Sequence, residues 1–319
     1  MQPLLSGFSR SLLQNKVGFV TGAGSPYGIG RSLVLGLAAA GARAVYATDL
    51  SLGNIASLQE EVRAMKSDCQ VHGAILDVTD EKQTISVLKE VLDKYGRMDF
   101  YFANAGVGNY VPLQNTDAAY YDKMISIMQR SFFLALRYGG QAMCNVSADK
   151  PSPGGSIVVT SSIAGVSGGI SDISYSSAKA AVANMVKPGS VQLAASNIRV
   201  NSIAPGFVRS SIIASTRQAL ANMQSSANTG GTSTNKTITK EEASKAFDAT
   251  LGRLASDKYY FDRIPEPEEI ASIGVFLASE LSASVNGQNI VADNGKTASG
   301  QADRTIGPIH AMAPLSALG

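Results

Sequence analysis

Residues 156 to 179 read SIVVTSSIAGVSGGISDISYSSAK. The apolar, β-branched run at 157–160 has the composition of a buried strand, and it stops at Ser161 and Ser162. A parallel strand opens onto a cleft at its carboxyl end, so polar side chains placed there can face a ligand. We therefore expect this strand to end at a functional site.

Two further polar side chains follow on a segment with the Ala-rich composition of a helix. Tyr175 and Lys179 are four residues apart, a spacing that puts them on one helical face. A free phenol titrates near ~10, so a neighbouring ammonium is needed to favour the phenolate at neutral pH. The hydroxyl of Ser162 can hold a substrate oxygen while the proton moves. The trio predicts acid–base catalysis, although a Tyr-x-x-x-Lys spacing also arises by chance on helices.

Composition narrows the class of partner. The 319 residues are 45% hydrophobic, enough to bury the core of one α/β domain or, as the alternative, of two. The net charge is +2, no basic run occurs, and Trp is absent. Nothing in this composition indicates nucleic-acid binding, so the expected partner is a small-molecule substrate.

Metal and membrane sites are not expected. Cys69 and Cys144 form no Cys-x-x-Cys pair, and His72 and His310 are the two histidines, so neither a metal site nor a disulfide framework is predicted. Residues 1–16 lack the apolar core of a secretion signal, and no run reaches the ~18 apolar residues that span a bilayer. We expect a cytoplasmic protein with no membrane partner.

A glycine-rich turn follows the first predicted strand, at 17–20. Residues 21–30 read TGAGSPYGIG and lead into a predicted helix at 29–40. Glycines let the backbone turn sharply and approach a pyrophosphate, which binds the amides that open such a helix. The pattern predicts a dinucleotide loop, although any strand-to-helix turn favours glycine.

The next predicted strand, at 44–48, ends at Asp49. An acidic residue at this distance from the glycine turn meets the adenosine ribose, accepts from both ribose hydroxyls and repels a 2′-phosphate. This favours NAD, with NADP the less favoured cofactor. The alternative is that Asp49 caps the helix that follows.

The alternation of strand and helix continues along the chain, as in a parallel α/β sheet. The next predicted elements are a helix at 54–66, a strand at 71–76, a helix at 81–95 and a strand at 100–103. Asp77 and Val78 follow one strand, and the Asn104-Ala105-Gly106 turn follows another. Because Asn and Gly tolerate tight backbone angles, this turn can also be purely structural.

Together these motifs resemble those of the classical short-chain dehydrogenase/reductase family. That family has TGxxxGIG, an Asn-Ala-Gly turn, a Ser before Tyr-x-x-x-Lys, and a later Pro-Gly, and this chain has all of them in that order, ending at Pro205 and Gly206. The resemblance covers roughly residues 15 to 295. It implies a Rossmann-type, doubly wound α/β fold with a seven-stranded parallel sheet, in a single domain spanning 1–319.

The resemblance also implies a role for each matching residue. Ser162, Tyr175 and Lys179 would be catalytic, and the last two would also contact the cofactor. The other implied cofactor contacts are Gly22, Gly28, Ile29 and Gly30 at the pyrophosphate, Asp49 at the adenosine ribose, Asp77 and Val78 at the adenine, Asn104, Ala105 and Gly106 at the middle of the cofactor, and Pro205, Gly206, Val208 and Ser210 around the nicotinamide. A homodimer or homotetramer is expected.

The chain departs from the family pattern in its glycine loop, its central helix and its catalytic helix. The loop has five residues between TG and GIG where the family has three. Met128 stands where the family has an asparagine that holds a proton-relaying water, which a thioether cannot hold. Pro188 is expected to interrupt and kink the helix that carries Tyr175, which weakens the case for a dimer face there.

A fourth departure is the long segment at 210–263. We predict an enlarged substrate lid with a low-complexity run at 225–234 and a helix at 240–254; the alternative is an insertion with no role. We expect residues 1–14 to form a leader and 296–319 to form a tail that packs over the lid or reaches a partner subunit. The apolar residues expected to line the lid, unless they belong to the core, are Phe207, Ile212, Ile213, Phe247, Tyr259, Tyr260 and Phe261.

These expectations combine into one function and two alternatives. The leading prediction is an NAD-dependent oxidoreductase that interconverts a bulky, moderately apolar secondary alcohol and its ketone, with oxidation the expected direction and Tyr175 the general acid/base. The long lid suggests a role in natural-product biosynthesis. The alternatives are a redox-neutral isomerase or cyclase that uses bound NAD(P), which Met128 suggests, and a non-catalytic nucleotide-binding regulator, which has no need of an intact trio.

Overall fold

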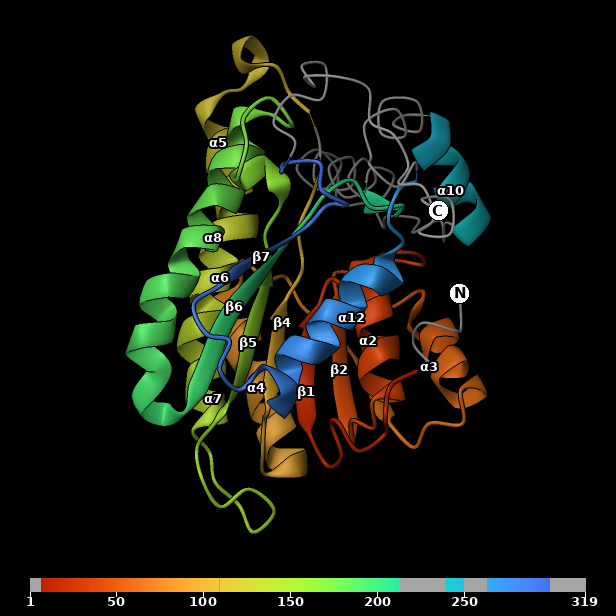
Figure 1. Ribbon diagram of the computed structural model, residues 1–319, viewed down its shortest axis with the longest axis vertical. Helices are drawn as coiled ribbons and strands as arrows, with labels where there is room; N and C mark the ends of the chain where they lie inside the picture. The colour runs from red at the N-terminus through yellow and green to blue at the C-terminus, as the bar shows by residue number, and fades with distance from the viewer. Residues whose placement is uncertain (1–6, 109, 213–238, 250–262, 299–319) are drawn as a thin grey trace, which may run out of the picture.

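The computed structural model describes residues 7–108, 110–212, 239–249 and 263–298. In this part of the chain, parallel strands form one seven-stranded sheet in the order β3-β2-β1-β4-β5-β6-β7, with helices on both faces (Figure 1). The order reverses between β1 and β4, which is where a doubly wound sheet binds its ligand. The predicted doubly wound α/β fold is confirmed.

The strands lie where the β-branched and aromatic runs occur in the sequence. Phe100 and Phe102 pack into one face of the sheet and Tyr101 into the other, as the two-residue period of a strand requires. The bounds are β1 Val17–Thr21, β2 Ala44–Asp49, β3 Gln70–Ile75, β4 Phe100–Ala103, β5 Gly155–Thr160, β6 Ile198–Pro205 and β7 Asn289–Ala292.

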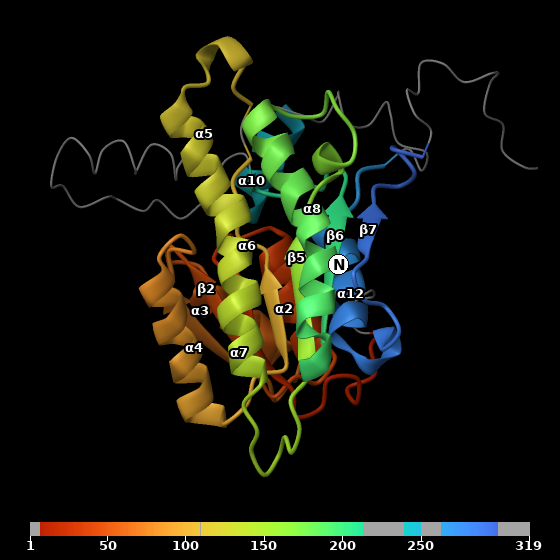
Figure 2. The same cartoon turned by 90° about the vertical axis from the view of Figure 1, so that its left-hand side faces the viewer.

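Two helical layers cover the sheet (Figures 1 and 2). One face carries α2 (Ile29–Ala39), α3 (Ile55–Ala64) and α12 (Pro267–Ala278). The other carries α4 (Glu81–Tyr95), a long helical run and α8 (Ile173–Leu193). A further helix, α10 (Lys240–Phe247), lies beyond the carboxyl ends of the strands.

The long helical run begins at Ala118 and ends at Met143. It consists of α5 (Ala118–Ile125), α6 (Ser131–Leu134) and α7 (Gly140–Met143), joined by π-helical segments at Ser126–Arg130 and Ala135–Gly139. Single π-helical turns inside α-helices frequently occur at functional sites. The short 3₁₀ helices of the described chain are Leu113–Asn115, Ile163–Gly165, Ala194–Ser196 and Glu280–Ser282.

The hydrophobic core is split by the sheet into two layers. Leu33 and Leu37 of α2 pack with Ile270 and Val275 of α12 on one side. On the other side, Phe132 and Val182 pack with Phe19 of β1 and Tyr101 of β4. The predicted leader contributes Leu13, which is fully buried in the first layer.

Helix α8 corrects one prediction, because it continues through Pro188 to Leu193. The predicted interruption is therefore wrong. Proline removes one backbone hydrogen bond, but Val182 and Val186 on the same helix are fully buried against the sheet. Tertiary packing of a helix face outweighs the local loss, since it supplies most helical stability in a folded protein.

Much of the predicted lid and tail lies outside the described residues. Helix α10 begins as predicted at residue 240 and ends at Phe247, and residues 250–254 are not described. The low-complexity run at 225–234, most of the tail and four residues named as lid lining, Ile213, Tyr259, Tyr260 and Phe261, are also outside. Within the described residues, no helix is both long and apolar enough to cross a membrane.

Candidate active site

A cavity of about 540 Å³ opens at the carboxyl ends of the strands. Every residue that the sequence named as catalytic or cofactor-binding lines it, so the structure brings the whole predicted set together. These are Gly22, Gly28, Ile29, Gly30, Asp49, Asp77, Val78, Asn104, Ala105, Gly106, Ser162, Tyr175, Lys179, Pro205, Gly206, Val208 and Ser210.

The glycine loop brings the start of α2 to the cavity wall. Gly22 has φ +69°, and a Cβ on Gly30 would lie 2.1 Å from the Gly22 carbonyl oxygen, so both positions need glycine. Helix α2 has no side-chain cap at Gly28 and no acidic residue in its first turn, whereas Asp80 caps α4 and Asp172 caps α8. Because no side chain caps them, the first N–H groups of α2 are available to bind an anion such as a pyrophosphate.

Asp49 holds the lengthened loop and lines the cavity. Its Oδ2 accepts from Gly24 N at 2.9 Å and its Oδ1 from Leu50 N at 2.8 Å. Burial raises the pKa of Asp49, and these backbone hydrogen bonds oppose that rise. Asp49 does not cap the following helix, because α3 begins after Asn54, whose side chain donates to Gly24 O. The alternative of a helix cap is therefore wrong.

Asn104 joins three strand ends below the cavity. Its amide nitrogen donates to Thr21 O at 3.0 Å, and its amide oxygen accepts from Thr160 Oγ1 at 2.9 Å. Thr21 Oγ1 in turn accepts from the backbone N–H groups of Asn104 and Ala105. The structural role left open for this turn is thus present, and it places Ala105 and Gly106 on the cavity surface.

The trio comes from the end of β5 and the first turns of α8. Asp172 Oδ1 accepts from Tyr175 N at 2.8 Å and so caps α8, which places Tyr175 in the first turn of the helix. Ser162 Oγ accepts from Ala164 N at 3.1 Å, and the serine hydroxyl lies close enough to the phenol of Tyr175 to lower the pKa of that phenol. Lys179 Nζ donates to Thr160 O at 2.7 Å and lies 5.6 Å from the centre of the Tyr175 ring. The predicted neighbours on one helical face do meet.

Burial dominates the electrostatics of the trio. It lowers the pKa of Lys179 to about 8. It raises the pKa of Tyr175; the nearby Ser162 hydroxyl opposes this rise, and the charge of Asp172 adds to it. The direction for Tyr175 is opposite to that expected from a neighbouring ammonium, because loss of solvent is the largest cause of the shift and the charge of Lys179 is not among its causes.

Met128 lies behind the cavity lining, in a hydrophobic cluster with Ala178 against which Tyr175 packs. It is 2% exposed and lies in the first π-helical segment. A Cβ on Gly106 would be 3.6 Å from Lys179 Nζ and 3.9 Å from Met128 Cγ, so both side chains border the same glycine. The side chain that stands in place of the family's asparagine is therefore a thioether on the same side of Gly106 as the lysine, and a thioether is at best a weak hydrogen-bond acceptor.

The cavity lining includes lid residues that the sequence named and other residues that it missed. Phe207, Ile212 and Phe247 line the cavity as predicted. Tyr27 and Ser25 also line it, and both belong to the five residues between TG and GIG, where the family has three; that extra length was the available signal. No cluster of three or more His, Cys, Asp or Glu side chains that could hold a metal occurs in the described residues.

The comparisons agree with this geometry. Residues 16–221 match the family model of the short chain dehydrogenases. The chain is 31% identical to 3-oxoacyl-(acyl-carrier-protein) reductase of Thermotoga maritima over 89% of this chain and 98% of that protein. It is 32% identical to cis-4-hydroxycyclohexanecarboxylate dehydrogenase of Sinomonas cyclohexanicum over 89% and 97%. A crystal structure of a short-chain dehydrogenase/reductase from Burkholderia xenovorans has a TM-score of 0.73 at 28% identity, covering 90% of this chain and 98% of that one.

Proposed function

This chain belongs to the short-chain dehydrogenase/reductase family, whose members act on alcohols and ketones with a nicotinamide cofactor, and we propose that it is an NAD-dependent oxidoreductase of a bulky, moderately apolar secondary alcohol. The observation that carries the proposal is one cavity that joins the glycine loop and Asp49 to Ser162, Tyr175 and Lys179. The loop and Asp49 suit a dinucleotide, and the trio suits proton transfer beside it.

The charges around Asp49 support NAD as the cofactor. The carboxylate can accept from the ribose hydroxyls and would repel a 2′-phosphate. Arg31, the basic residue of α2, is 4% exposed and turned towards α3, where it bonds Glu61 at 2.9 Å, Ser57 at 3.0 Å and the carbonyl of Asn54 at 3.1 Å. A guanidinium held in this way does not serve a 2′-phosphate.

The trio would move the proton of the substrate hydroxyl. Ser162 would hold the substrate oxygen, and Tyr175 would accept the hydroxyl proton in oxidation or return it in reduction. Lys179 would favour the phenolate by its charge and hold the cofactor ribose. The bound nicotinamide supplies the hydride acceptor or donor. Because burial raises the pKa of Tyr175, oxidation should accelerate with increasing pH.

The substrate end of the cavity supports an apolar substrate. Phe207, Ile212, Phe247, Val107 and Ile170 all line the cavity, and Phe207 packs with Phe247. Apolar walls with a few convergent polar groups are typical of sites for small molecules. The related dehydrogenase of cis-4-hydroxycyclohexanecarboxylate supports a ring-containing secondary alcohol as the substrate class to try first.

The proposal is tested by calorimetric titration of the full chain with NAD and NADP, followed by NADH formation on a panel of cyclic secondary alcohols. We expect tighter binding of NAD and a turnover that Tyr175→Phe reduces by about 10²- to 10⁴-fold. A preference for NADP would remove the role given to Asp49. Tyr175-dependent product without a net change in NADH would favour a redox-neutral isomerase or cyclase, and NAD binding with no product would favour a regulator.

The remaining predictions concern the setting of the enzyme. A homodimer or homotetramer, a cytoplasmic location and a role in natural-product biosynthesis stay predictions of the sequence. So do the domain limits, with one domain spanning 1–319 and a lid at 210–263.

A further inference from the structure

Arg209 joins three segments that border the cavity. Its backbone N–H donates to Pro265 O at 3.0 Å, just before α12. Its Nη1 lies 2.5 Å from Asp248 Oδ1 and 3.5 Å from Ser244 Oγ, at the end of α10 and within it. Its guanidinium carbon is 5.5 Å from the centre of the Phe247 ring. One side chain thus makes three kinds of contact with α10.

Glu266 extends these contacts to the glycine loop. Its Oε1 lies 3.5 Å from Arg209 Nε, and its Oε2 accepts from the hydroxyl of Tyr27. The carbonyl of Tyr27 accepts from both the N–H and the hydroxyl of Ser211, at 2.8 Å and 2.7 Å. Burial and Glu266 raise the pKa of Tyr27, so the phenol remains a donor at neutral pH.

These bonds make a continuous series from Tyr27 through Glu266 and Arg209 to Asp248. At the far end, Phe247 is 2% exposed and forms the cavity wall. The side chains of Glu266 and Asp248 are 44% and 52% exposed, so their ion pairs with Arg209 contribute little to the stability of the whole protein. These ion pairs can instead fix the local position of α10, the short helix that carries Phe247.

We propose that Arg209 is a positioning residue that seats α10 on the cavity, and that Tyr27 and Glu266 connect this seat to the glycine loop, so that dinucleotide binding orders the substrate-side wall. The connection depends on Tyr27, which lies in the lengthened glycine loop. The coupling rests on the proposed function, because it needs a dinucleotide at that loop; the seating of α10 by Arg209 does not. A coupling between two sites of this kind changes an affinity by about 5- to 150-fold.

The seating is tested by hydrogen exchange of residues 239–249 in the full chain. We expect Arg209→Met to raise exchange in this segment by about 10-fold and to abolish any slowing by NAD. Arg263→Met is the matched control, since it removes a two-bond arginine–carboxylate pair with Glu269 on α12, at 2.6 Å and 2.8 Å, without touching α10. Unchanged exchange in Arg209→Met would overturn the proposal. Should that variant not fold, Arg209→Lys, which cannot reach both carboxylates, should give an intermediate increase.

The coupling is tested with Tyr27→Phe, which keeps the ring and removes its hydrogen bond. NAD should slow exchange at 239–249 in the wild type, and this effect should fall by about fivefold in the variant although NAD still binds. Tyr138→Phe is the control, because Tyr138 makes the same kind of bond to Glu81, and neither of these two residues lines the cavity. Wild-type protein that binds NAD without any change at 239–249 would overturn the coupling. Wild-type protein that does not bind NAD would instead overturn the proposed function, and the Arg209 comparison would still be readable.

Discussion

Each end of the central sheet buries a lysine, and the two lysines are bonded differently. At the amino ends of the strands, Lys150 Nζ donates to Met98 O at 2.7 Å and to Met143 O at 2.6 Å. At the carboxyl ends, Lys179 Nζ donates to a single carbonyl, that of Thr160. Burial lowers the pKa of both lysines. Lys150 uses two of its three N–H donors in hydrogen bonds to backbone carbonyls, whereas Lys179 uses one and keeps two for a ligand.

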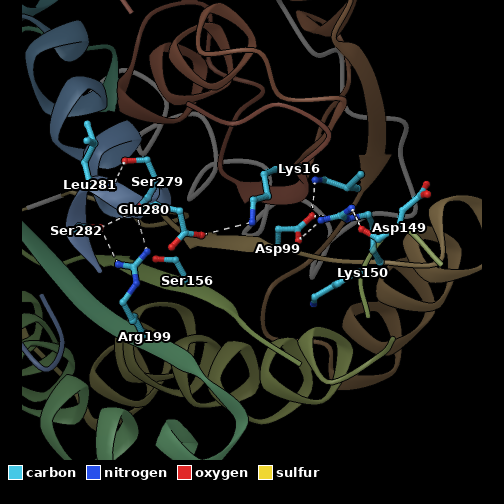
Figure 3. A network of polar contacts seen from close by, with 12 residues as sticks. Lys16, Asp99, Asp149, Lys150, Ser156, Arg199, Ser279, Glu280, Leu281 and Ser282 are labelled. Atoms are coloured by element: carbon cyan, nitrogen blue, oxygen red, sulfur yellow. Dashed lines mark hydrogen bonds and ion pairs between the residues drawn. The ribbon is translucent and has the colours of Figure 1, made fainter. Parts of the chain in front are cut away.

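The neighbours of the two lysines reinforce this difference. Beside Lys150, Asp99 accepts from Val17 N at 2.8 Å and from two nitrogens of Arg97, at 2.9 Å and 2.8 Å (Figure 3). Arg97 and Asp99 are both 5% exposed, so this is a buried ion pair joined by two hydrogen bonds. No carboxylate of the described residues forms a salt bridge with Lys179. The amino end stabilises the sheet, and the carboxyl end holds a desolvated cation that costs stability, as functional sites commonly do.

The largest effect expected from this difference is on catalysis. Lys179→Met should reduce turnover by about 10²- to 10⁴-fold, because the phenolate of Tyr175 loses its cation, while the free energy of unfolding at neutral pH stays the same or increases. NADH formation and urea unfolding measure the two quantities. Lys89→Met, at an exposed lysine of α4, controls for loss of a positive charge. A Lys179→Met variant that lost stability but kept its turnover would show that Lys179 stabilises the fold and does not serve catalysis.

The opposite result is expected at the amino end. Asp99→Asn leaves the buried guanidinium of Arg97 without its anionic partner, so the free energy of unfolding should fall by about 3–5 kcal/mol. Turnover per folded molecule should not change, because the site lies at the other end of the strands. Asp149→Asn, at a carboxylate whose side chain is 68% exposed, should change stability by less than about 1 kcal/mol. Equal effects of the two substitutions would show that the pair does not stabilise the sheet.

A smaller loss of stability is expected when Lys150 is replaced. Lys150→Met leaves Met98 O without the donor it has now, in a buried position, and the free energy of unfolding should fall by about 2 kcal/mol. The same substitution at Lys179 should not lower it. Urea unfolding of both variants in one buffer makes this comparison directly. If Lys150→Met proved the more stable of the two, the hydrogen bonds to the carbonyls would not offset the cost of burying that lysine.

The carboxyl end was the more predictable of the two from the sequence. Its residues follow local rules: glycine where φ is positive at Gly22, and polar residues where strands stop, as at Asn104 and Ser162. Contacts between distant segments follow no such rule, and the bond from Tyr27 to Glu266 joins positions 239 residues apart. The continuation of α8 through Pro188 was also missed, since it depends on packing against the sheet.

The sign of the Tyr175 pKa shift was missed for a similar reason. The spacing of Tyr175 and Lys179 correctly predicted that they share a helical face, but not how deeply both would be buried. Burial depends on the whole fold. The charge of a neighbour can be read from a motif, whereas the loss of solvent around it cannot.

The smallest expected effect is on how the free energy of unfolding changes with pH when Lys179 is replaced. The pKa of Lys179 is about 8 in the folded protein and 10.5 ordinarily, so between these pH values the unfolded chain binds more protons and the free energy of unfolding rises with pH. Lys179→Met lacks this group, so its advantage over the wild type should shrink by about 1 kcal/mol from about pH 7.5 to about pH 9. Urea unfolding of both proteins at each pH measures the difference, in which contributions from other groups cancel. A constant difference would mean that Lys179 keeps its ordinary pKa, and that the cavity is wetter around the ammonium than its burial indicates.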